Sequence, residues 1–247
     1  NNPGLMVRIN NDGSVDETFL TDLISYSLAY VSDLRTFTDG TIFVSGRPQS
    51  NQNTQPIYGL VESESNTLFL RNNFLLNNQG KWDRNYGDRL QPFTDISDII
   101  KLANGGFYVS GGSDLYEQNG ITKKGLVRLL PNGNLDPSFN LDNIFQNDNS
   151  IRINNITQLP NGQIIILGKL GVYGKRIARL NADGSLDNIF NATGAGFSLN
   201  ANGFFAEPGN NLILADEKLL VAGNFTTYNG APRNNIARIT LINDEPC

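Results

Sequence analysis

Residues 179–190 read Arg-Leu-Asn-Ala-Asp-Gly-Ser-Leu-Asp-Asn-Ile-Phe, and this stretch decides the fold because its pattern returns along the chain. A turn followed by an Asp and then an aromatic residue recurs around the glycines at positions 13, 80, 133 and 184. A second unit alternates with it, over residues 37–46, 102–111, 159–168 and 214–223. Two interleaved series with one period indicate a single supersecondary unit that is used repeatedly.

The first unit predicts a hairpin with a three-residue loop, whose last residue is a Gly with positive φ that forms a bulge. This register places apolar residues opposite each other in four copies: Ile9 and Val15, Leu76 and Trp82, Leu129 and Leu135, and Leu180 and Leu186. It also places opposite charges together in three copies: Arg8 and Asp16, Arg128 and Asp136, and Arg179 and Asp187. In the remaining copy Leu75 replaces the Arg, so Asp83 needs another partner.

The second unit predicts a different hairpin, with a two-residue type I′ turn, because Asp-Gly and Asn-Gly are the preferred pairs for that turn. The turns are expected at Asp39-Gly40, Asn104-Gly105 and Asn161-Gly162, with Asp216-Glu217 in the fourth copy. A two-residue loop predicts four apolar pairs: Phe37 with Ile42, Leu102 with Phe107, Leu159 with Ile164, and Leu214 with Leu219.

Each repeat therefore offers about four short strands in two hairpins, which is the content of a propeller blade. Residues 163–167 and 218–222 are apolar on both faces, as expected for a middle strand between stacked blades. We predict an all-β, β-propeller-like domain over 1–247, with four to five small antiparallel blades and repeat units near 1–30, 31–95, 96–152, 153–203 and 204–247. An open β-solenoid and a β-sandwich are the competing arrangements.

The two ends suggest how such a ring could close. The chain begins part-way through a repeat and ends before the last Asp-Gly turn, so we expect residues 5–19 to pair in one sheet with residues 212–241. The chain starts without Met and without an apolar signal segment, so we expect a processed product or part of a longer protein.

The strings in residues 179–190 and 159–168 resemble those of the delta-60 repeat family, and the resemblance extends over most of the chain. It implies a propeller fold and a setting in large secreted, cell-surface or phage structural proteins. It implies no activity and no site residues.

Bulk composition excludes several classes of function. The net charge is −5 and the chain has no basic cluster, so we expect no nucleic-acid partner. No apolar stretch is long enough to cross a bilayer, so we expect no membrane insertion. The chain has no His and its one Cys is Cys247, which excludes His-based catalytic arrangements and His-ligated metal sites.

Carboxylates offer two further candidates. Residues 10–13 and 181–184, each with an Asp three residues on, resemble part of a calcium loop, but Gln79 and Asn132 replace the key Asp in the other copies. We therefore expect a turn with an ion pair, and neither a metal nor another cofactor. A glycosidase would need two carboxylates at one site, which the unrepeated acids Glu62, Glu64, Asp95, Asp98 and Glu207 could supply.

A Tyr lies five residues after the strand-ending Gly in three copies, at Tyr116, Tyr173 and Tyr228. These rings could form a rim that binds a sugar or a protein, or they could pack a loop against the next blade. The composition and repeats favour a non-enzymatic extracellular, cell-surface or virion module, such as a phage tail or adhesion component, that binds a protein or a surface glycan within a larger assembly. The alternative is a secreted carbohydrate-active enzyme on a propeller scaffold.

Overall fold

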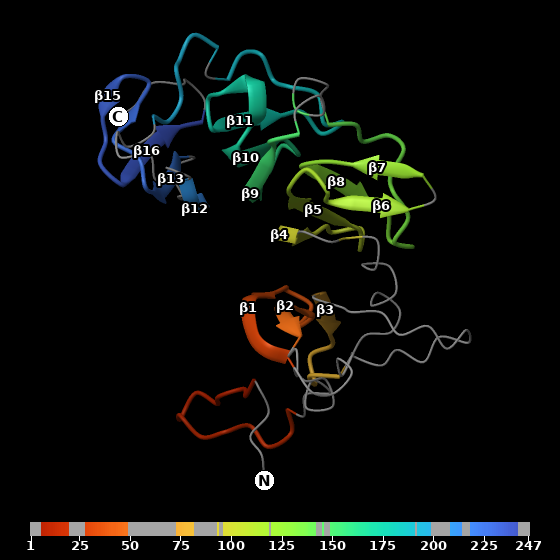
Figure 1. Cartoon of the computed structure of the whole chain (residues 1–247). Coiled ribbons are helices and arrows are strands. Elements are labelled where there is room, and N and C mark those ends of the chain that lie inside the picture. The colour runs from red at the N-terminus through yellow and green to blue at the C-terminus, as the bar shows by residue number, and fades with distance from the viewer. Residues whose placement is uncertain are drawn as a thin grey trace, which may run out of the picture. The chain divides into compact units, whose positions relative to one another are not determined.

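The computed structural model is made of antiparallel strands (Figure 1). It describes residues 6–19, 28–48, 73–81, 93, 96–118, 120–141, 145, 149–190, 192–198, 208–213 and 218–241. Within these ranges, no helix is long and apolar enough to span a membrane. The all-β class predicted from the sequence is confirmed.

The chain divides into two compact units, residues 1–94 and 95–247. The first unit holds a short hairpin, in which Ile9 pairs with Val15, and one three-stranded sheet. The strands of that sheet are β1 (Leu28–Thr36), β2 (Ile42–Pro48) and β3 (Asn73–Leu76), in that spatial order.

The second unit holds three sheets of the same design, in which consecutive strands lie side by side. They are β4 (Ile96–Lys101), β5 (Phe107–Gly111) and β8 (Leu126–Leu129); β9 (Arg152–Gln158), β10 (Ile164–Lys169) and β11 (Ile177–Leu180); and β12 (Pro208–Ile213), β13 (Lys218–Gly223) and β16 (Ile236–Thr240). A fourth segment joins two of them through single bridges, Leu129 to Leu135 and Leu180 to Leu186. Each of these two sheets is therefore a four-segment meander, as the repeat predicts.

A small element connects the second and third strands of each sheet in the second unit. It is the hairpin of β6 (Tyr116–Gln118) and β7 (Ile121–Lys123), the 3₁₀ helix η3 (Gly171–Tyr173), and the hairpin of β14 (Thr227–Tyr228) and β15 (Ala231–Pro232).

The register predicted for the hairpins around Gly13, Gly133 and Gly184 is confirmed, at the bridges of Ile9, Leu129 and Leu180. The predicted partner of Leu76, Trp82, lies outside the described residues, as does Asp83.

The register predicted for the other type of hairpin, in residues 37–46 and the three equivalent segments, is wrong by one residue. Thr36 pairs with Ile42, so Phe37 lies opposite Thr41, and Lys101 pairs with Phe107. Gln158 likewise pairs with Ile164, and Ile213 with Leu219. The predicted pairs Phe37–Ile42, Leu102–Phe107, Leu159–Ile164 and Leu214–Leu219 therefore do not form.

The loop that replaces the type I′ turn has three residues. Gly40 has a φ of 81° and donates its N–H to the carbonyl of Phe37, and Phe37 donates its N–H to the carbonyl of Thr41. The hairpin at Gly13 has the same two bonds, from Gly13 to Asn10 and from Asn10 to Ser14. Only the Gly has positive φ, whereas a type I′ turn needs two such residues. Both types of hairpin in the repeat thus use one type of turn.

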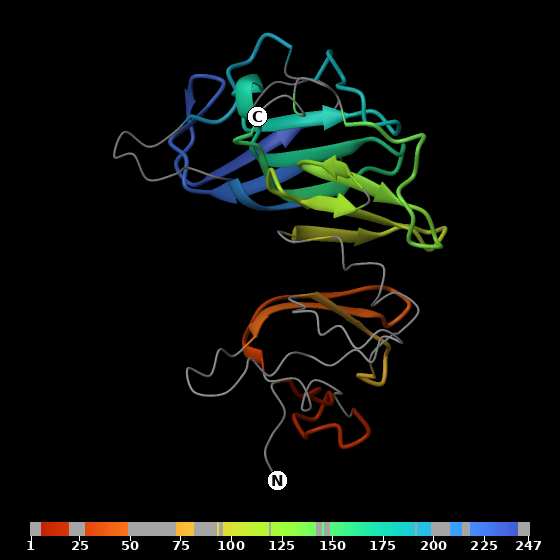
Figure 2. The ribbon, with the colours of Figure 1, turned by 45° about the vertical axis from the view of Figure 1, so that its right-hand side comes forward.

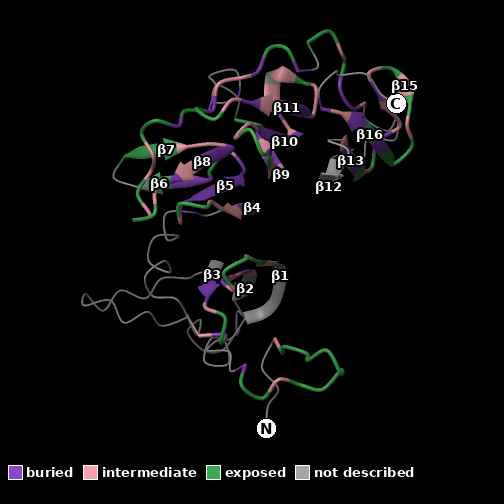
Figure 3. Cartoon of the chain, turned by 180° about the vertical axis from the view of Figure 1, so that it is seen from behind, coloured by how far each residue is buried: buried purple, intermediate pink, exposed green. Residues whose placement is uncertain are grey.

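The core lies between the stacked sheets of the second unit (Figure 2). The middle strand β10 has both faces buried. Ile164 and Ile166 pack into a cluster with Tyr108 and Leu126 of the preceding sheet. Ile165 and Leu167 belong to a second cluster, which includes residues of β13 and β16. Figure 3 shows buried residues along the middle strands β5 and β10.

The last sheet differs from this pattern. In β13 Leu219 and Val221 are buried, but Ala222 is exposed and Leu220 is half-buried. One face of this apolar strand is therefore less buried than either face of β10.

The predicted closure by residues 5–19 and 212–241 is not shown among the described residues and stays a prediction. Ile9 pairs with Val15, while β13 already has β12 on one edge and β16 on the other.

Candidate functional site

The three tyrosines named from the sequence lie in the connecting elements. Tyr116 begins β6 and is 7% exposed, and Tyr228 in β14 is fully buried. Burial raises the pKa of Tyr116 above its usual value of 10.0. These two rings lie inside the protein and leave little surface for a sugar to stack on.

Tyr173, in η3, is half-buried and packs edge-to-face on Phe145, with ring centroids 5.4 Å apart. Tyr228 lies 4.9 Å from Phe197, measured between ring centroids. Tyr173 and Tyr228 thus pack against aromatic residues and Tyr116 is buried, which favours the packing interpretation over a shared rim.

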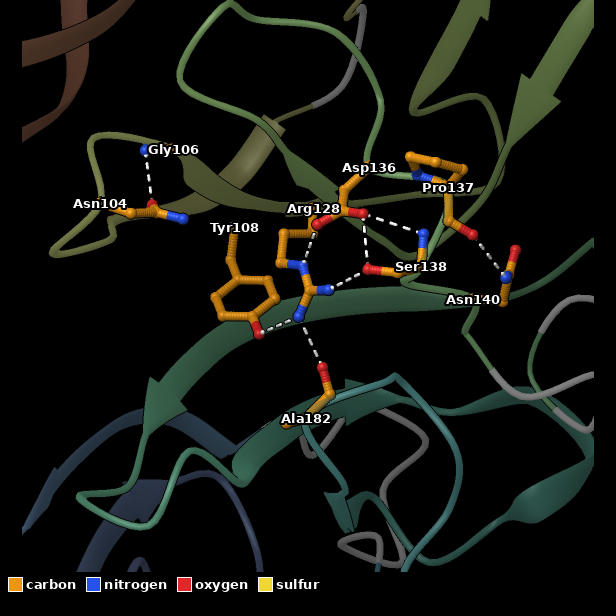
Figure 4. A network of polar contacts seen from close by, with 9 residues as sticks. All are labelled: Asn104, Gly106, Tyr108, Arg128, Asp136, Pro137, Ser138, Asn140 and Ala182. Carbon is orange, nitrogen blue, oxygen red and sulfur yellow. Dashed lines mark hydrogen bonds and ion pairs between the residues drawn. The ribbon is translucent and has the colours of Figure 1, made fainter.

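A polar network surrounds Arg128 and joins two consecutive sheets (Figure 4). Its Nε donates to Oδ2 of Asp136 at 2.8 Å, and its Nη2 donates to the hydroxyl of Ser138 at 2.8 Å. Nη1 donates to the carbonyl of Ala182 at 2.6 Å, in the turn that follows β11. The guanidinium carbon lies 5.2 Å from the ring centroid of Phe139, a cation–π distance.

The same network recurs around Arg8 and Arg179. Each Nε donates to its Asp at 2.8 Å, and each guanidinium carbon lies 4.8 Å from the centroid of Phe19 or Phe190. Nη1 of Arg8 donates to the carbonyl of Asn78, and Nη1 of Arg179 donates to that of Leu241, each at 2.5 Å. Each Arg therefore holds its own hairpin and also contacts a later repeat.

The carboxylates of this network are held ionised. Asp16 accepts hydrogen bonds from the hydroxyl and N–H of Thr18 and from Arg8, and these bonds lower its pKa to about 2. For Asp136, burial opposes ionisation most strongly, but the bonds from Ser138 and Arg128 outweigh it and the pKa is lowered. The pKa of Asp187 is lowered in the same way, by Ile189, Arg179 and Gln163 against the effect of burial.

The turn carboxylates considered for calcium are engaged in their own loops. Oδ1 of Asp12 accepts the N–H and hydroxyl of Ser14, and Oδ1 of Asp183 accepts those of Ser185. These bonds lower the pKa of both Asp residues. In the third copy Oδ1 of Asn132 accepts the N–H of Asn134, so a neutral amide makes the same backbone bond. This equivalence favours a structural turn.

Of the unrepeated acids considered for a glycosidase, the structure describes Asp98. It is 4% exposed, and its Oδ2 accepts the side-chain N–H of Asn155 at 3.1 Å and the N–H of Ile156 at 3.0 Å. Asp98 thus connects β4 to β9 of the next sheet. Glu62, Glu64, Asp95 and Glu207 lie outside the described residues.

A pocket of about 390 Å³ lies beside the β6–β7 hairpin. Ile121 and Lys123 of β7 line it together with Leu126, Phe139 and Leu141. Its lining is mainly apolar and also includes the charged residues Lys123, Arg128 and Asp136. The repeat pattern gave no indication of this pocket, because only part of its lining, such as Arg128, Asp136 and Phe139, belongs to the recurring motif, whereas Ile121 and Lys123 do not.

The sequence pattern did not predict the Arg–Phe contacts or the Arg-to-carbonyl bonds, although a signal for the Arg–Phe contacts was present. Arg and Phe recur with the same spacing, at Arg8 and Phe19, Arg128 and Phe139, and Arg179 and Phe190. Constant spacing across a bulged hairpin indicates a contact between the two side chains. A bond to a backbone carbonyl in another repeat leaves no such trace in the sequence.

One protein-family model matches parts of these repeats. Residues 4–19, 107–139, 159–190 and 214–242 match a family described as a domain of unknown function (DUF5122) of β-propeller type. The chain is built from β-propeller-type repeats. The matched segments contain all three Arg–Asp pairs described above.

Solved structures similar to these β-propeller-type repeats are distant in sequence. One is the extracellular domain of a one-component system of B. thetaiotaomicron, with 13% identity, a TM-score of 0.46, and coverage of 94% of this chain and 29% of that one. Another is PorZ, a surface component of the type-IX secretion system of Porphyromonas gingivalis, with 11% identity, a TM-score of 0.47, and coverage of 95% and 30%. The chain thus spans about 30% of the length of these two structures. No curated protein matches the chain.

Proposed function

We propose that this chain is a non-enzymatic interaction or structural module outside the cell, which binds a protein or a glycan. One observation carries the proposal: three recurring Arg residues make the same structural contacts in their three hairpins. Arg8, Arg128 and Arg179 each pair with the Asp of their own hairpin and bond a carbonyl of a later repeat.

The use of these carboxylates supports a module without catalysis. A glycosidase needs two carboxyl groups that face one substrate, one of them available to donate a proton. Asp16, Asp136 and Asp187 are instead held ionised by hydrogen bonds within their hairpins. Asp98 bonds to two N–H groups of the next sheet.

The setting follows from the resemblance of the repeat strings to the delta-60 family, whose members occur in secreted, cell-surface and phage structural proteins. A bacterial surface protein and a phage tail component both fit this setting. The net charge of −5 supports a protein or glycan partner over a nucleic acid.

The pocket beside β7 is the place where we expect a ligand to bind. It combines a mainly apolar lining with the charged residues Lys123, Arg128 and Asp136, and small ligand sites commonly combine apolar walls with a few polar groups. Ile121, at its mouth, is an exposed apolar residue. An apolar side chain or the apolar face of a sugar ring fits these walls.

A glycan array and a glycan hydrolysis screen on the same preparation test the proposal. We expect saturable binding without release of product, and weaker binding by Ile121→Asp. Thr122→Ala is the matched control, because Thr122 is exposed on the same strand and does not line the pocket. Release of product would favour the carbohydrate-active enzyme, and equal loss in both variants would contradict the pocket as the binding place.

A further inference from the structure

The N-terminal hairpin exposes apolar residues that its counterparts bury. Val7 is 51% exposed and Ile9 is 54% exposed. Val127 and Leu129 occupy the same positions in β8, and Ala178 and Leu180 occupy them in β11, and each of these is at most 3% exposed. One repeat position is thus open at one end of the array and closed elsewhere.

The missing cover can be read from the other copies. In β8 and β11 one edge pairs with the fourth segment. The opposite edge pairs with β5 or β10, the second strand of the hairpin β4–β5 or β9–β10, which we call an inner hairpin. β16 pairs with β13 in the same way. The described residues show no such strand beside residues 6–9.

Among the residues that the structure describes, the backbone of this edge is open as well. Arg8 accepts the N–H of Asp16, and Asn10 donates to the carbonyl of Ser14, so both point toward the fourth segment. Because backbone groups alternate in direction along a strand, those of Val7 and Ile9 point to the opposite side. An exposed strand edge with apolar side chains is a template for another strand.

The following sheet has the same gap. Leu34 of β1 is 41% exposed, whereas Ile156, at its position in β9, is 3% exposed. Ile156 packs in the cluster that contains Tyr108 of β5, and its N–H bonds to Asp98 of β4. An inner hairpin beside residues 6–9 would cover Leu34 in the same way.

We propose that residues 6–9 bind an inner hairpin of this repeat type, supplied by a polypeptide outside residues 1–247. The partner strand carries consecutive apolar residues, as Ile164–Leu167 does in β10. The described inner hairpins of this chain do not serve, because each already pairs with its own third strand. The bound strand adds to the sheet and buries Val7, Ile9 and Leu34.

This inference rests on the proposed function only in naming a partner for an interaction module. The test uses the full chain and a fluorescent peptide with the sequence of residues 96–111, an inner hairpin. We expect saturable binding by anisotropy, and slower hydrogen exchange at the amides of Val7 and Ile9 in the complex. A scrambled peptide is expected not to bind.

The matched variants are Val7→Lys with Ile9→Lys, and Ile189→Lys as the control. All three residues are exposed, so the substitutions leave the core intact, and Ile189 does not lie on the open edge. We expect the double variant to weaken binding about tenfold or more, because lysines protect an edge strand, and the control to bind like the wild type.

Absence of saturable binding, equal binding by the double variant, or protection outside residues 6–9 and β1 would overturn the inference. Self-association of the wild type that the double variant loses would also overturn it, since a second copy would then occupy the edge. These results leave the proposed function standing, whereas hydrolysis of a glycan contradicts that function and not this inference.

Discussion

Nη1 of Arg128 donates a hydrogen bond of 2.6 Å to the carbonyl oxygen of Ala182, 54 positions further along the chain. The same guanidinium holds Asp136 in its own hairpin and lies against the ring of Phe139. One side chain therefore fixes the hairpin that contains Asp136, which we call an outer hairpin, and joins it to the next blade. Leu75, at the equivalent position in β3, cannot make these bonds.

Replacement of Asp187 by Ala is expected to lower the free energy of unfolding by about 1–3 kcal/mol, since it removes a largely buried acceptor of charged and neutral bonds. Asp187 accepts hydrogen bonds from Arg179, Gln163 and Ile189. Urea denaturation measures the change. Asp16→Ala is the control with a smaller loss, because its partner Arg8 is 42% exposed. Equal losses in the two variants would contradict the role of burial.

Two glycines in equivalent turns separate backbone strain from steric contact. Gly13 and Gly184 both have positive φ, but a Cβ on Gly13 meets nothing within 4 Å, whereas one on Gly184 would lie 2.5 Å from the carbonyl oxygen of Asn140. Gly13→Ala should cost about 1–2 kcal/mol from the left-handed conformation alone.

Gly184→Ala should cost about 1–3 kcal/mol more, because the backbone of the preceding blade must move. Melting temperature and urea denaturation of the two variants provide the comparison. A similar loss in both would show that Asn140 does not pack against this turn.

Acid should destabilise the fold. The pKa of Asp16 is lowered from 3.8 to about 2 by Thr18 and Arg8, and the pKa values of Asp136 and Asp187 are also lowered. A pKa that is lower in the folded state means that the unfolded chain binds the proton more tightly. The stabilisation is therefore complete above pH 3.8 and is lost as the pH falls through about 2. The urea concentration at the unfolding midpoint, measured from pH 6 to pH 2, should decrease between pH 3.8 and about pH 2. Midpoints that increase toward acid pH would contradict the stabilising role of these ion pairs.

Removal of divalent cations should leave stability unchanged. The turn carboxylates of Asp12 and Asp183 already accept bonds from Ser14 and Ser185, and Asn132 makes the same backbone bond without charge. Thermal unfolding with and without a chelator is the measurement. A melting temperature that drops with chelator and returns with calcium would place a metal in these loops.

The apolar and charged patterns were enough to predict the outer hairpins. Ile9 with Val15 and Arg179 with Asp187 are the pairs found, because the three-residue loop fixes the register on both sides of the Gly. The inner hairpins were misjudged, since an Asn-Gly pair satisfies both a type I′ turn and a three-residue loop with a positive-φ Gly. The match between residues 37–41 and 10–14 was the available signal for one shared turn.

The candidate site was harder to predict. Regular spacing placed Tyr116, Tyr173 and Tyr228 in the connecting elements, but spacing does not determine whether a ring faces solvent or the core. The bond of Asp98 to Asn155 joins two sheets, and its partners are distant in sequence. The pocket at β7 depends on the side chains of a single repeat, so periodicity gives no indication of it.

The central claim is that the repeated Arg residues are structural and join consecutive blades. Hydrogen exchange of Arg128→Met, followed by mass spectrometry, tests it most directly. Arg238→Met is the control, because Arg238 occupies the same position in β16, is exposed, and has no ion pair or hydrogen bond through its side chain in the described part of the chain. We predict faster exchange for Arg128→Met in β8 and also in β10 and β11 of the next blade, with little change for the control. Faster exchange confined to β8, or the same change in both variants, would contradict the claim.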